Sequence, residues 1–337
     1  MTFMPSVEAG EPVRILMSAQ AAERLGPRIE GVLGNVPYLL VSPKAETANI
    51  DADVAFISRD VTGLSTKHRI LPATQHFYDA MLASRSLRWV HAHSAGADRP
   101  IFGMLRQRGV IVTTSSGANA SVVAQTALAG ILALARQFPL LAEAQRAHRW
   151  APLIGSGLPR DLAGQTATVV GWGPIGQAIG RFLLALDLKL IVVRQSTQSA
   201  SPDAETVCFD GLKTVLPRTD WLVLACPLKP ATRSLVDAAA LSLLPPSAHL
   251  VNVARGEVVD EDALSDALRE GRLAGAYLDV FAHEPLPQAS PLWDIKNVIV
   301  TPHSAGFSDG NGERVMRMFL ENLSRWLRNE PLSHIAL

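Results

Sequence analysis

Residues 166–193 read TATVVGWGPIGQAIGRFLLALDLKLIVV. The stretch starts with a short apolar run, passes through a glycine-rich turn at 171–176, continues with helix-like apolar spacing and ends in a second apolar run. This order predicts a strand, a tight turn, a helix and a second, parallel strand. In that setting the spacing G-x-G-x-x-G is the fingerprint of a dinucleotide-binding βαβ unit. A glycine-bearing loop without a ligand is the alternative interpretation.

Each glycine of this turn has its own expected task. Gly171 permits the tight turn, Gly173 lets the backbone come close to a pyrophosphate, and Gly176 lets the helix lie near the sheet. The first N–H groups of the helix, around Pro174 and Ile175, would point at the phosphates with the help of the helix dipole. We therefore expect residues 171 and 173–176 to bind the cofactor.

The bulk composition indicates a globular protein of about two domains. The chain has 337 residues, of which 48% are hydrophobic and 18% charged, and its 31 Lys and Arg balance its 31 Asp and Glu. A balanced charge gives no field that favours nucleic acid or an anionic membrane. We see no signal peptide in the first residues and no apolar run long enough to span a bilayer. A cytoplasmic protein with neither nucleic-acid nor membrane partners is expected.

Strand-like and helix-like segments alternate on both sides of the fingerprint. Before it, residues 12–115 read as a small α/β unit. After it, apolar runs at 221–225, 250–253, 275–280 and 298–301 are separated by segments of helical spacing. This alternation predicts doubly wound parallel sheets. We also expect one long, mostly apolar helix over 120–141 and a final amphipathic helix over 307–329.

The residue that ends the second strand of the fingerprint bears on the choice of cofactor. An NAD-binding unit usually has an acidic residue about 20 positions after the glycines, which holds the ribose 2′-hydroxyl. Arg194 stands at that place, followed by Gln195, Ser196 and Thr197. An arginine with neighbouring hydroxyls suits a 2′-phosphate. We therefore favour NADP over NAD, with Arg194 and Ser196 as contacts; NAD binding beside a solvated Arg194 is the alternative interpretation.

Other reactive side chains offer weaker patterns. His91 and His93 stand two apart on a predicted strand, but no third ligand has suitable spacing, so no metal site is expected. The two cysteines, Cys208 and Cys226, suggest neither a disulfide framework nor a metal site. Cys226 has no visible base to activate it, and we expect a buried neutral thiol.

Four motifs in a fixed order carry a resemblance to a known family. The fingerprint is followed by NVARGEVVDEDAL at 252–264, DVFAHEPLP at 279–287 and TPHSAG at 301–306. Together they resemble the D-isomer-specific 2-hydroxyacid dehydrogenase family. Weaker similarity begins near Trp89 and includes SAGAD at 94–98, whereas the first eighty or so residues match only in general pattern.

The resemblance implies a catalytic set of three residues. Arg255 would clamp the substrate carboxylate with its forked donors. His303 would act as the general acid and base that exchanges a proton with the substrate oxygen. Glu284 would bond to the far side of the imidazole, setting its tautomer and favouring its charged form.

The resemblance also implies the remaining contacts and the domain plan. Asp279 would lie near the nicotinamide or the cofactor ribose, residues Cys226, Pro227 and Ala254 would line the cofactor, and backbone groups of Ser94, Ala95, Gly96 and Ala97 would meet the substrate carboxylate. The expected fold is α/β with two Rossmann-like domains. Residues 1–115 and 308–337 would form a discontinuous substrate-binding domain, and residues 116–307 the dinucleotide-binding domain. A homodimer is expected, with Trp150 as a candidate contact.

The expected activity is reversible, NAD(P)H-dependent reduction of a small 2-oxo acid, such as glyoxylate or hydroxypyruvate, to the D-2-hydroxy acid. One alternative is an NAD(H)-sensing interaction protein, similar to a corepressor, on the same fold. Another is a dehydrogenase of the phosphoglycerate or formate type.

Overall fold

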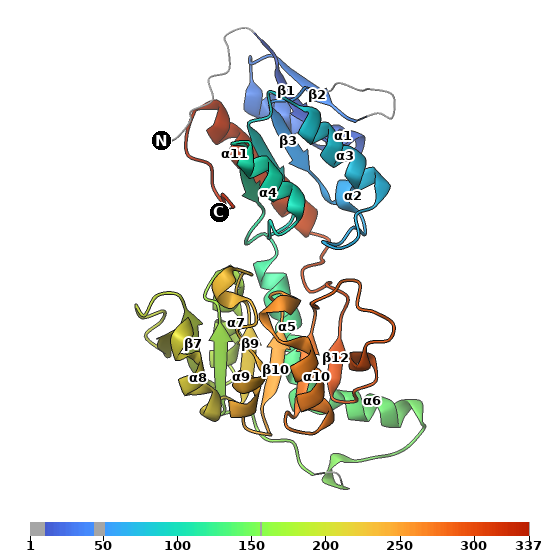
Figure 1. Ribbon diagram of the computed structural model, residues 1–337, viewed down its shortest axis with the longest axis vertical. Helices are drawn as coiled ribbons and strands as arrows, with labels where there is room; N and C mark the ends of the chain where they lie inside the picture. Colours follow the sequence, from blue (N-terminus) through green and yellow to red (C-terminus); the bar gives the residue numbers. More distant parts are fainter. Residues whose placement is uncertain (1–10, 44–50, 156, 337) are drawn as a thin grey trace. The chain divides into compact units, whose positions relative to one another are not determined.

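The computed structural model describes residues 11–43, 51–155 and 157–336. The prediction about a signal peptide concerns residues 1–10, which lie outside this part. The chain divides into two units, Met1–Asn119 with Ser308–Leu337 and Ala120–Phe307 (Figure 1). The division after Asn119 comes a few residues later than the boundary expected at 115 and 116, because the turn after the last strand of the first unit stays with that unit.

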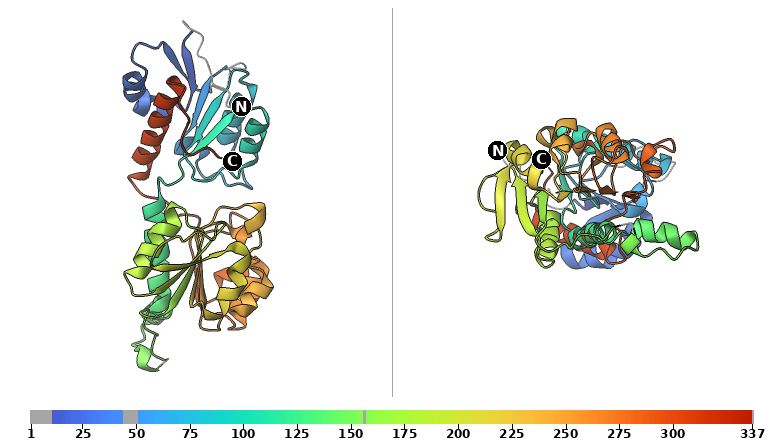
Figure 2. Two further views of the ribbon diagram at one scale, coloured as in Figure 1. Left: turned by 90° about the vertical axis from the view of Figure 1, so that its left-hand side faces the viewer. Right: turned by 90° about the horizontal axis from the view of Figure 1, so that it is seen from below.

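The first unit is a five-stranded parallel sheet covered by helices on both faces (Figure 2). The strand order is β2-β1-β3-β4-β5, with β1 at Val13–Leu16, β2 at Tyr38–Val41, β3 at Val54–Ile57, β4 at Trp89–Ala92 and β5 at Ile111–Thr114. One face carries α1 (Ala19–Leu33) and α11 (Asn311–Leu327). The other carries α2 (Arg59–Thr62), α3 (Pro72–Ala83) and α4 (Pro100–Gln107). Helix α11 returns to this unit from the end of the chain, so the unit is discontinuous.

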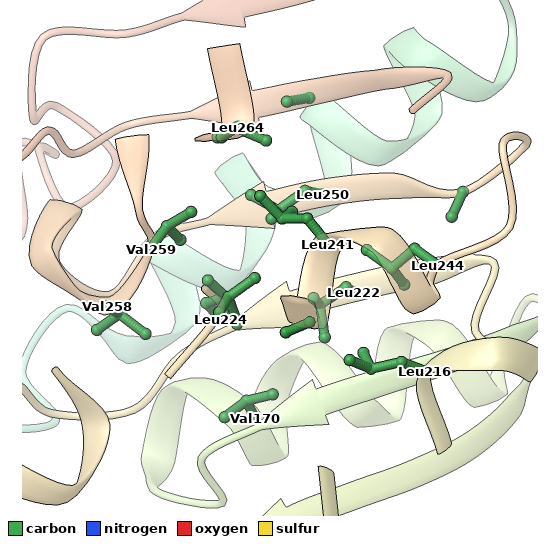
Figure 3. Close-up of a cluster of buried hydrophobic side chains, with 14 of the residues drawn as sticks. Val170, Leu216, Leu222, Leu224, Leu241, Leu244, Leu250, Val258, Val259 and Leu264 are labelled. Carbon is green, nitrogen blue, oxygen red and sulfur yellow. The ribbon is translucent and has the colours of Figure 1, made fainter. Parts of the chain in front are cut away.

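The second unit is a seven-stranded parallel sheet in the order β12-β11-β10-β9-β6-β7-β8. The strands are β6 (Thr166–Val170), β7 (Lys189–Arg194), β8 (Ala204–Cys208), β9 (Trp221–Leu224), β10 (His249–Asn252), β11 (Gly275–Leu278) and β12 (Val298–Val300). Helices α5 (Ala120–Ala135) and α7 (Pro174–Leu184) cover one face. Helices α8 (Leu212–Val215), α9 (Ala238–Leu243) and α10 (Glu261–Arg269) cover the other, where leucines and valines of strands and helices interlock (Figure 3). The predicted α/β class with doubly wound parallel sheets is confirmed.

Short 3₁₀ turns complete the second unit at Leu153–Gly155, Phe209–Gly211, Leu216–Arg218, Pro230–Thr232, Gly256–Val258 and Pro291–Trp293. Strand β8 had no counterpart among the predicted strands. It lies at the sheet edge and is only partly buried, so its residues AETVC lack the continuous apolar run that marks the central strands.

The single helix expected over 120–141 is wrong. Helix α5 ends at Ala135, Gln137 takes a left-handed conformation with φ 56°, and α6 runs from Phe138 to Arg146 at 70° to α5. Pro139 explains the break, because it has no N–H to donate to the carbonyl of Ala135. Within the described residues no single helix is long and apolar enough to cross a membrane; α5 and α6 pass that test only as a bent pair.

The order of the larger sheet reverses between β6 and β9. Strands β7 and β8 extend the sheet on one side of β6, while β9 to β12 extend it on the other. In open parallel sheets, ligands bind at the carboxyl ends of the strands where the order reverses. The fingerprint turn follows β6, so it stands at that place.

Candidate active site

Two glycines of the fingerprint turn are required by the packing of the protein itself. Gly171 has φ 99°, a conformation that L side chains rarely adopt, and a Cβ there would lie 2.6 Å from backbone atoms of Cys226. A Cβ on Gly176 would overlap the carbonyl oxygen of Gly171. The two glycines therefore let β6, β9 and the start of α7 approach closely where the strand order reverses.

Gly173 differs from both neighbours, and it tests whether the turn fits a dinucleotide. It caps α7 with an ordinary φ of −80°, and a Cβ there would meet no protein atom within 4 Å. Packing within the chain therefore does not call for glycine at this position, whereas the close approach of a pyrophosphate does. Pro174 is the first residue of α7, and the first helical bond runs from Gln177 to Gly173, which leaves the N–H groups of Ile175 and Gly176 at the helix start. The residues present fit the cofactor.

The predicted NADP contacts lie at the end of β7. Arg194 is its last residue, is half-buried and pairs in register with Cys208 of β8. Ser196 is exposed, and its hydroxyl accepts a hydrogen bond from the N–H of Gln198 at 3.1 Å. Both residues therefore lie beside the turn that leaves β7, at the carboxyl edge of the sheet.

The other expected cofactor-lining residues follow β9 and β10. Cys226 is buried beside Gly171, and burial raises the pKa of its thiol to about 11, so the thiol is neutral near pH 7. Pro227 is exposed, and its carbonyl accepts a hydrogen bond from Thr232. Ala254 is buried, and its carbonyl accepts a bond of 2.7 Å from the guanidinium of Arg255.

His303 and Glu284 meet at the carboxyl edge of the same sheet. The Nδ1 atom of His303 lies 2.9 Å from Oε2 of Glu284. The glutamate side chain is only 9% exposed, whereas the histidine side chain is 47% exposed. The second carboxylate oxygen, Oε1, accepts the N–H of Phe281 at 3.2 Å. The carboxylate is thus held from two sides, while much of the imidazole faces outward.

A second carboxylate stands behind Glu284. Glu261, at the start of α10, accepts the N–H of Ala282 at 2.8 Å and so braces the loop that carries Glu284. Burial raises the pKa of Glu261, and the nearby Glu284 is among the charges that add to the rise.

Arg255 directly follows the turn at the end of β10. Asn252, the last residue of that strand, bonds to both sides of this turn: its Oδ1 accepts the N–H of Ala254 at 3.0 Å, and its Nδ2 donates to the carbonyl of Arg255 at 3.1 Å. Arg255 and His303 follow strands that are two places apart in the sheet, with β11 and the Glu284 loop between them. One guanidinium and one imidazole therefore project from the same edge.

Asp279 has a role that sequence reasoning did not assign. It is 3% exposed, and its Oδ1 accepts the hydroxyl of Thr301 at 2.6 Å and the N–H of Ser304 at 2.8 Å. Its backbone carbonyl also accepts the N–H of His303 at 2.8 Å, where His303 has φ 51°. Burial raises the pKa of Asp279, while these hydrogen bonds and the charge of His303 act in the opposite direction. Asp279 thus holds the loop on both sides of His303.

Sequence reasoning also missed the residues that support this loop from behind. Tyr277 bonds to Thr301 at 2.8 Å, and Thr126 on α5 donates to the carbonyl of Ala305 at 3.1 Å. The Tyr277 ring lies on Gly130, where a Cβ would fall 2.5 Å from the ring. Thr301 and Asn252 lie inside motifs quoted for the family, which was a usable signal; Tyr277, Thr126 and Gly130 show no local signal.

The expected substrate contacts Ser94 to Ala97 lie in the first unit, after the carboxyl end of β4. The Ser94 hydroxyl donates to the carbonyl of Gly96 at 2.7 Å, and the Ser94 carbonyl accepts the N–H of Ser115 at 3.0 Å. Ala95 is exposed, and Gly96 and Ala97 are half-buried. One bond within the loop and one from Ser115, which follows β5, therefore hold its backbone.

The two nearby histidines bond to separate partners. His91 is fully buried between Thr113 and Ser115, at 2.8 and 3.1 Å, whereas His93 lies 2.8 Å from the hydroxyl of Thr62. Among the described residues no cluster of histidine, cysteine, aspartate or glutamate side chains could hold a metal ion.

Comparison with known proteins joins this geometry to a family. A family model for the "D-isomer specific 2-hydroxyacid dehydrogenase, NAD binding domain" matches residues 128–305, the part of the chain that holds the glycine turn, Arg255, Glu284 and His303. The chain belongs to the D-isomer-specific 2-hydroxyacid dehydrogenase family. It is an NAD(P)-dependent enzyme of that family.

Three relatives show how far the likeness reaches. A glyoxylate reductase of Thermofilum pendens is 32% identical over 260 residues, which cover 75% of each chain. A D-3-phosphoglycerate dehydrogenase of Mycobacterium leprae is 36% identical over 228 residues, covering 67% of this chain and 42% of that protein. The solved structure of a D-isomer-specific 2-hydroxyacid dehydrogenase of Xanthobacter autotrophicus Py2, in complex with NADPH and MES, aligns with a TM-score of 0.76 at 26% identity, covering 97% and 98% of the two chains.

Proposed function

We propose that this dehydrogenase reduces a small 2-oxo acid of the glyoxylate or hydroxypyruvate kind, reversibly, to the D-2-hydroxy acid. The observation that carries the proposal is the pair of His303 and Glu284, 2.9 Å apart at the carboxyl edge of the sheet. A nicotinamide bound at the glycine turn would supply the hydride. The side chains supply the proton and the grip on the substrate.

His303 is the proposed proton donor to the substrate oxygen. Its Nδ1 is occupied by Glu284, so the proton to be transferred sits on Nε2. A carboxylate bonded to the far nitrogen fixes the orientation and the tautomer of the ring. In the reverse reaction the same nitrogen accepts the proton as hydride leaves the alcohol carbon.

Arg255 is the proposed clamp for the substrate carboxylate. A guanidinium presents two parallel donors that match the two oxygens of a carboxylate. Its backbone is fixed by Asn252, so the side chain starts from a defined point. Backbone groups of Ser94 to Ala97, in the first unit, are also proposed as substrate contacts.

NADPH is the proposed preferred cofactor. Arg194 stands at the end of β7, where an acidic residue would favour NADH, and Ser196 adds an exposed hydroxyl beside it. The solved structure of the Xanthobacter autotrophicus relative is a complex with NADPH. Asp279 is proposed to act through the His303 loop rather than by direct contact with the cofactor, because its carboxylate is already engaged by that loop.

A homodimer is proposed through the segment that contains α6. Phe138, Trp150, Ile154 and Leu158 expose 56%, 97%, 79% and 75% of their surfaces. A hollow of about 780 Å³ beside the segment is lined partly by Leu134, Leu140 and Pro159. Apolar groups exposed in this way favour a protein contact.

Light scattering tests the proposed homodimer. The wild type should have twice the mass of one chain, and Ile154→Asp should lower the measured mass toward that of the monomer. A monomeric wild type refutes it.

The function itself is tested with a panel of 2-oxo acids. Oxidation of NADPH or NADH is followed by absorbance with glyoxylate, hydroxypyruvate, pyruvate and the phosphorylated form of hydroxypyruvate. Glyoxylate or hydroxypyruvate should give the highest kcat/KM, with NADPH preferred. A clear preference for the phosphorylated acid would instead place the chain with the phosphoglycerate dehydrogenases. Cofactor binding without turnover of any acid would favour the sensing protein.

A further inference from the structure

Trp172 occupies the first variable position of the glycine turn, and the proposed chemistry does not use it. Its ring is half-buried and lies against Gly180 of α7, where a Cβ would come within 2.5 Å of the ring atom Cη2. Gly180 is therefore small because the indole lies on it. The ring also packs against the apolar cluster beneath α5 and α7, so its position is set by rigid elements.

The indole N–H bonds to the turn between β7 and β8. Trp172 Nε1 donates to the carbonyl oxygen of Ala200 at 3.2 Å. The N–H of Ala200 donates in turn to the hydroxyl of Thr206, on β8, at 2.9 Å. The turn of residues 195–203 is thus tied at Ala200 to the glycine turn on one side and to the sheet on the other.

The other side-chain bonds in the 195–203 turn are local. The N–H of Gln198 donates to Ser196 at 3.1 Å, and the Ser199 hydroxyl donates to the carbonyl of Ser201 at 3.2 Å. Residues 195–199 are exposed. An exposed turn held by short-range bonds loses conformational freedom when it closes on a ligand, which weakens binding. The hydrogen bond from the fixed indole of Trp172 already restricts the turn at Ala200, so less conformational entropy is lost when a ligand binds.

We propose that Trp172 is a positioning residue for cofactor selectivity, which holds the 195–203 turn so that Arg194 and Ser196 meet the 2′-phosphate of NADPH. The proposal rests on the proposed preference for NADPH. Since NADH has no 2′-phosphate, its binding depends less on the order of this turn. Loss of the indole N–H therefore weakens NADPH binding selectively.

The decisive variant is Trp172→Phe, which keeps an aromatic ring on Gly180 and removes the N–H. Trp221→Phe is the matched control: Trp221 donates its Nε1 to Gln165 at 2.7 Å in the same unit, but at the start of β9 and so at the opposite edge of the sheet. Dissociation constants for NADPH and NADH are measured by titration calorimetry. KM for NADPH and kcat are measured with the substrate that the wild type prefers.

In Trp172→Phe the dissociation constant for NADPH should rise about three- to tenfold, the effect of one lost hydrogen bond. That for NADH should stay within about twofold, and the kinetic change should fall on KM for NADPH rather than on kcat. Trp221→Phe should leave the ratio of the two constants as in the wild type. Equal weakening of both cofactors in Trp172→Phe, or no change in either, overturns the proposal.

A second variant covers the case in which Trp172→Phe folds poorly. Thr206→Val removes the other bond to Ala200 and should weaken NADPH binding selectively as well; an unchanged ratio of constants counts against the proposal. The two proposals fail separately. A wild type that shows no preference for NADPH refutes the proposed cofactor, whereas a wild type that prefers NADPH, with Trp172→Phe keeping the same ratio, refutes the role of Trp172 alone.

Discussion

Gly176 faces the carbonyl oxygen of Gly171 so closely that a Cβ added to Gly176 would overlap that oxygen. Gly173, between them in sequence, has open space where its Cβ would stand. The same amino acid thus serves two purposes within one turn. Gly171 and Gly176 are required for the protein to close on itself, whereas Gly173 leaves room for something that approaches from outside.

The two purposes are separable by experiment. Gly176→Ala should lower the free energy of unfolding by about 1–3 kcal/mol, because the methyl group forces the turn apart. Gly173→Ala should change it by less than about 1 kcal/mol, since its φ suits alanine. It should nevertheless raise the dissociation constant of NADPH by on the order of tenfold or more, because the methyl takes the place of the pyrophosphate. Chemical denaturation and calorimetry measure the two effects; tight NADPH binding by Gly173→Ala would contradict the assignment.

Replacing His303 with asparagine should lower kcat by about 10²–10⁴, the usual contribution of a general acid. The dissociation constant of NADPH should stay within about twofold, because the substitution removes the proton donor and leaves the glycine turn intact. Steady-state kinetics and a cofactor titration measure both quantities. The control is His283→Asn, an exposed neighbour of Glu284, which should retain wild-type turnover. Full activity in His303→Asn would exclude it as the acid.

Arg255→Lys keeps a positive charge but loses the fork of two donors. The kcat/KM for 2-oxo acids should fall about 10- to 150-fold, which corresponds to the loss of one charge-assisted hydrogen bond. Cofactor binding should be unaffected. Arg160→Lys is a suitable control, since Arg160 pairs with Asp220 beside the amino ends of the strands. Similar losses in both variants would speak against a carboxylate clamp at Arg255.

Arg194→Asp should reverse the cofactor preference. The new carboxylate would repel a 2′-phosphate and accept a hydrogen bond from a 2′-hydroxyl, so the NADPH/NADH ratio of kcat/KM should fall by on the order of tenfold or more. Arg181→Asp, an exposed position on α7, controls for the change in net charge. An unchanged NADPH/NADH ratio of kcat/KM in Arg194→Asp would refute a contact between Arg194 and the 2′-phosphate.

Acid should destabilise the first unit through His91. Burial lowers the pKa of His91 to about 3, below its ordinary value of 6.5. In the unfolded chain His91 therefore binds a proton near pH 6.5, whereas in the folded chain it stays neutral until about pH 3. The free energy of unfolding that His91 contributes above pH 6.5 is thus lost as the pH falls toward about 3. The expected slope is up to about 1.4 kcal/mol per pH unit for this group.

Denaturation curves between about pH 7 and pH 5 measure that slope. His91→Gln should be less stable overall, because it disturbs the bonds to Thr113 and Ser115, but its stability should depend less steeply on pH. The exposed His76 of α3 provides the control as His76→Gln. An equal slope in wild type and His91→Gln would show that other groups cause the acid sensitivity.

Local pattern was enough to predict the fold class and the family. Alternating apolar runs and helical spacing imply parallel sheets covered by helices, because such strands must be joined by crossovers. Motifs after β10, β11 and β12 predicted that Arg255, Glu284 and His303 follow the carboxyl ends of neighbouring strands, which share one edge of a parallel sheet. Those signals lie within short stretches of sequence, so they can be read without coordinates.

Tertiary structure alone decided the contacts between distant segments. Trp172 bonds to Ala200, and Asp279 and Tyr277 support the loop that carries His303. His91 is buried by segments distant in sequence. No periodicity in the sequence links the residues of these contacts. The bend at Gln137 and the edge strand β8 likewise depend on surroundings that local hydropathy does not encode. Each of these features gains its stability from packing against another part of the chain, and for that reason short stretches of sequence did not predict it.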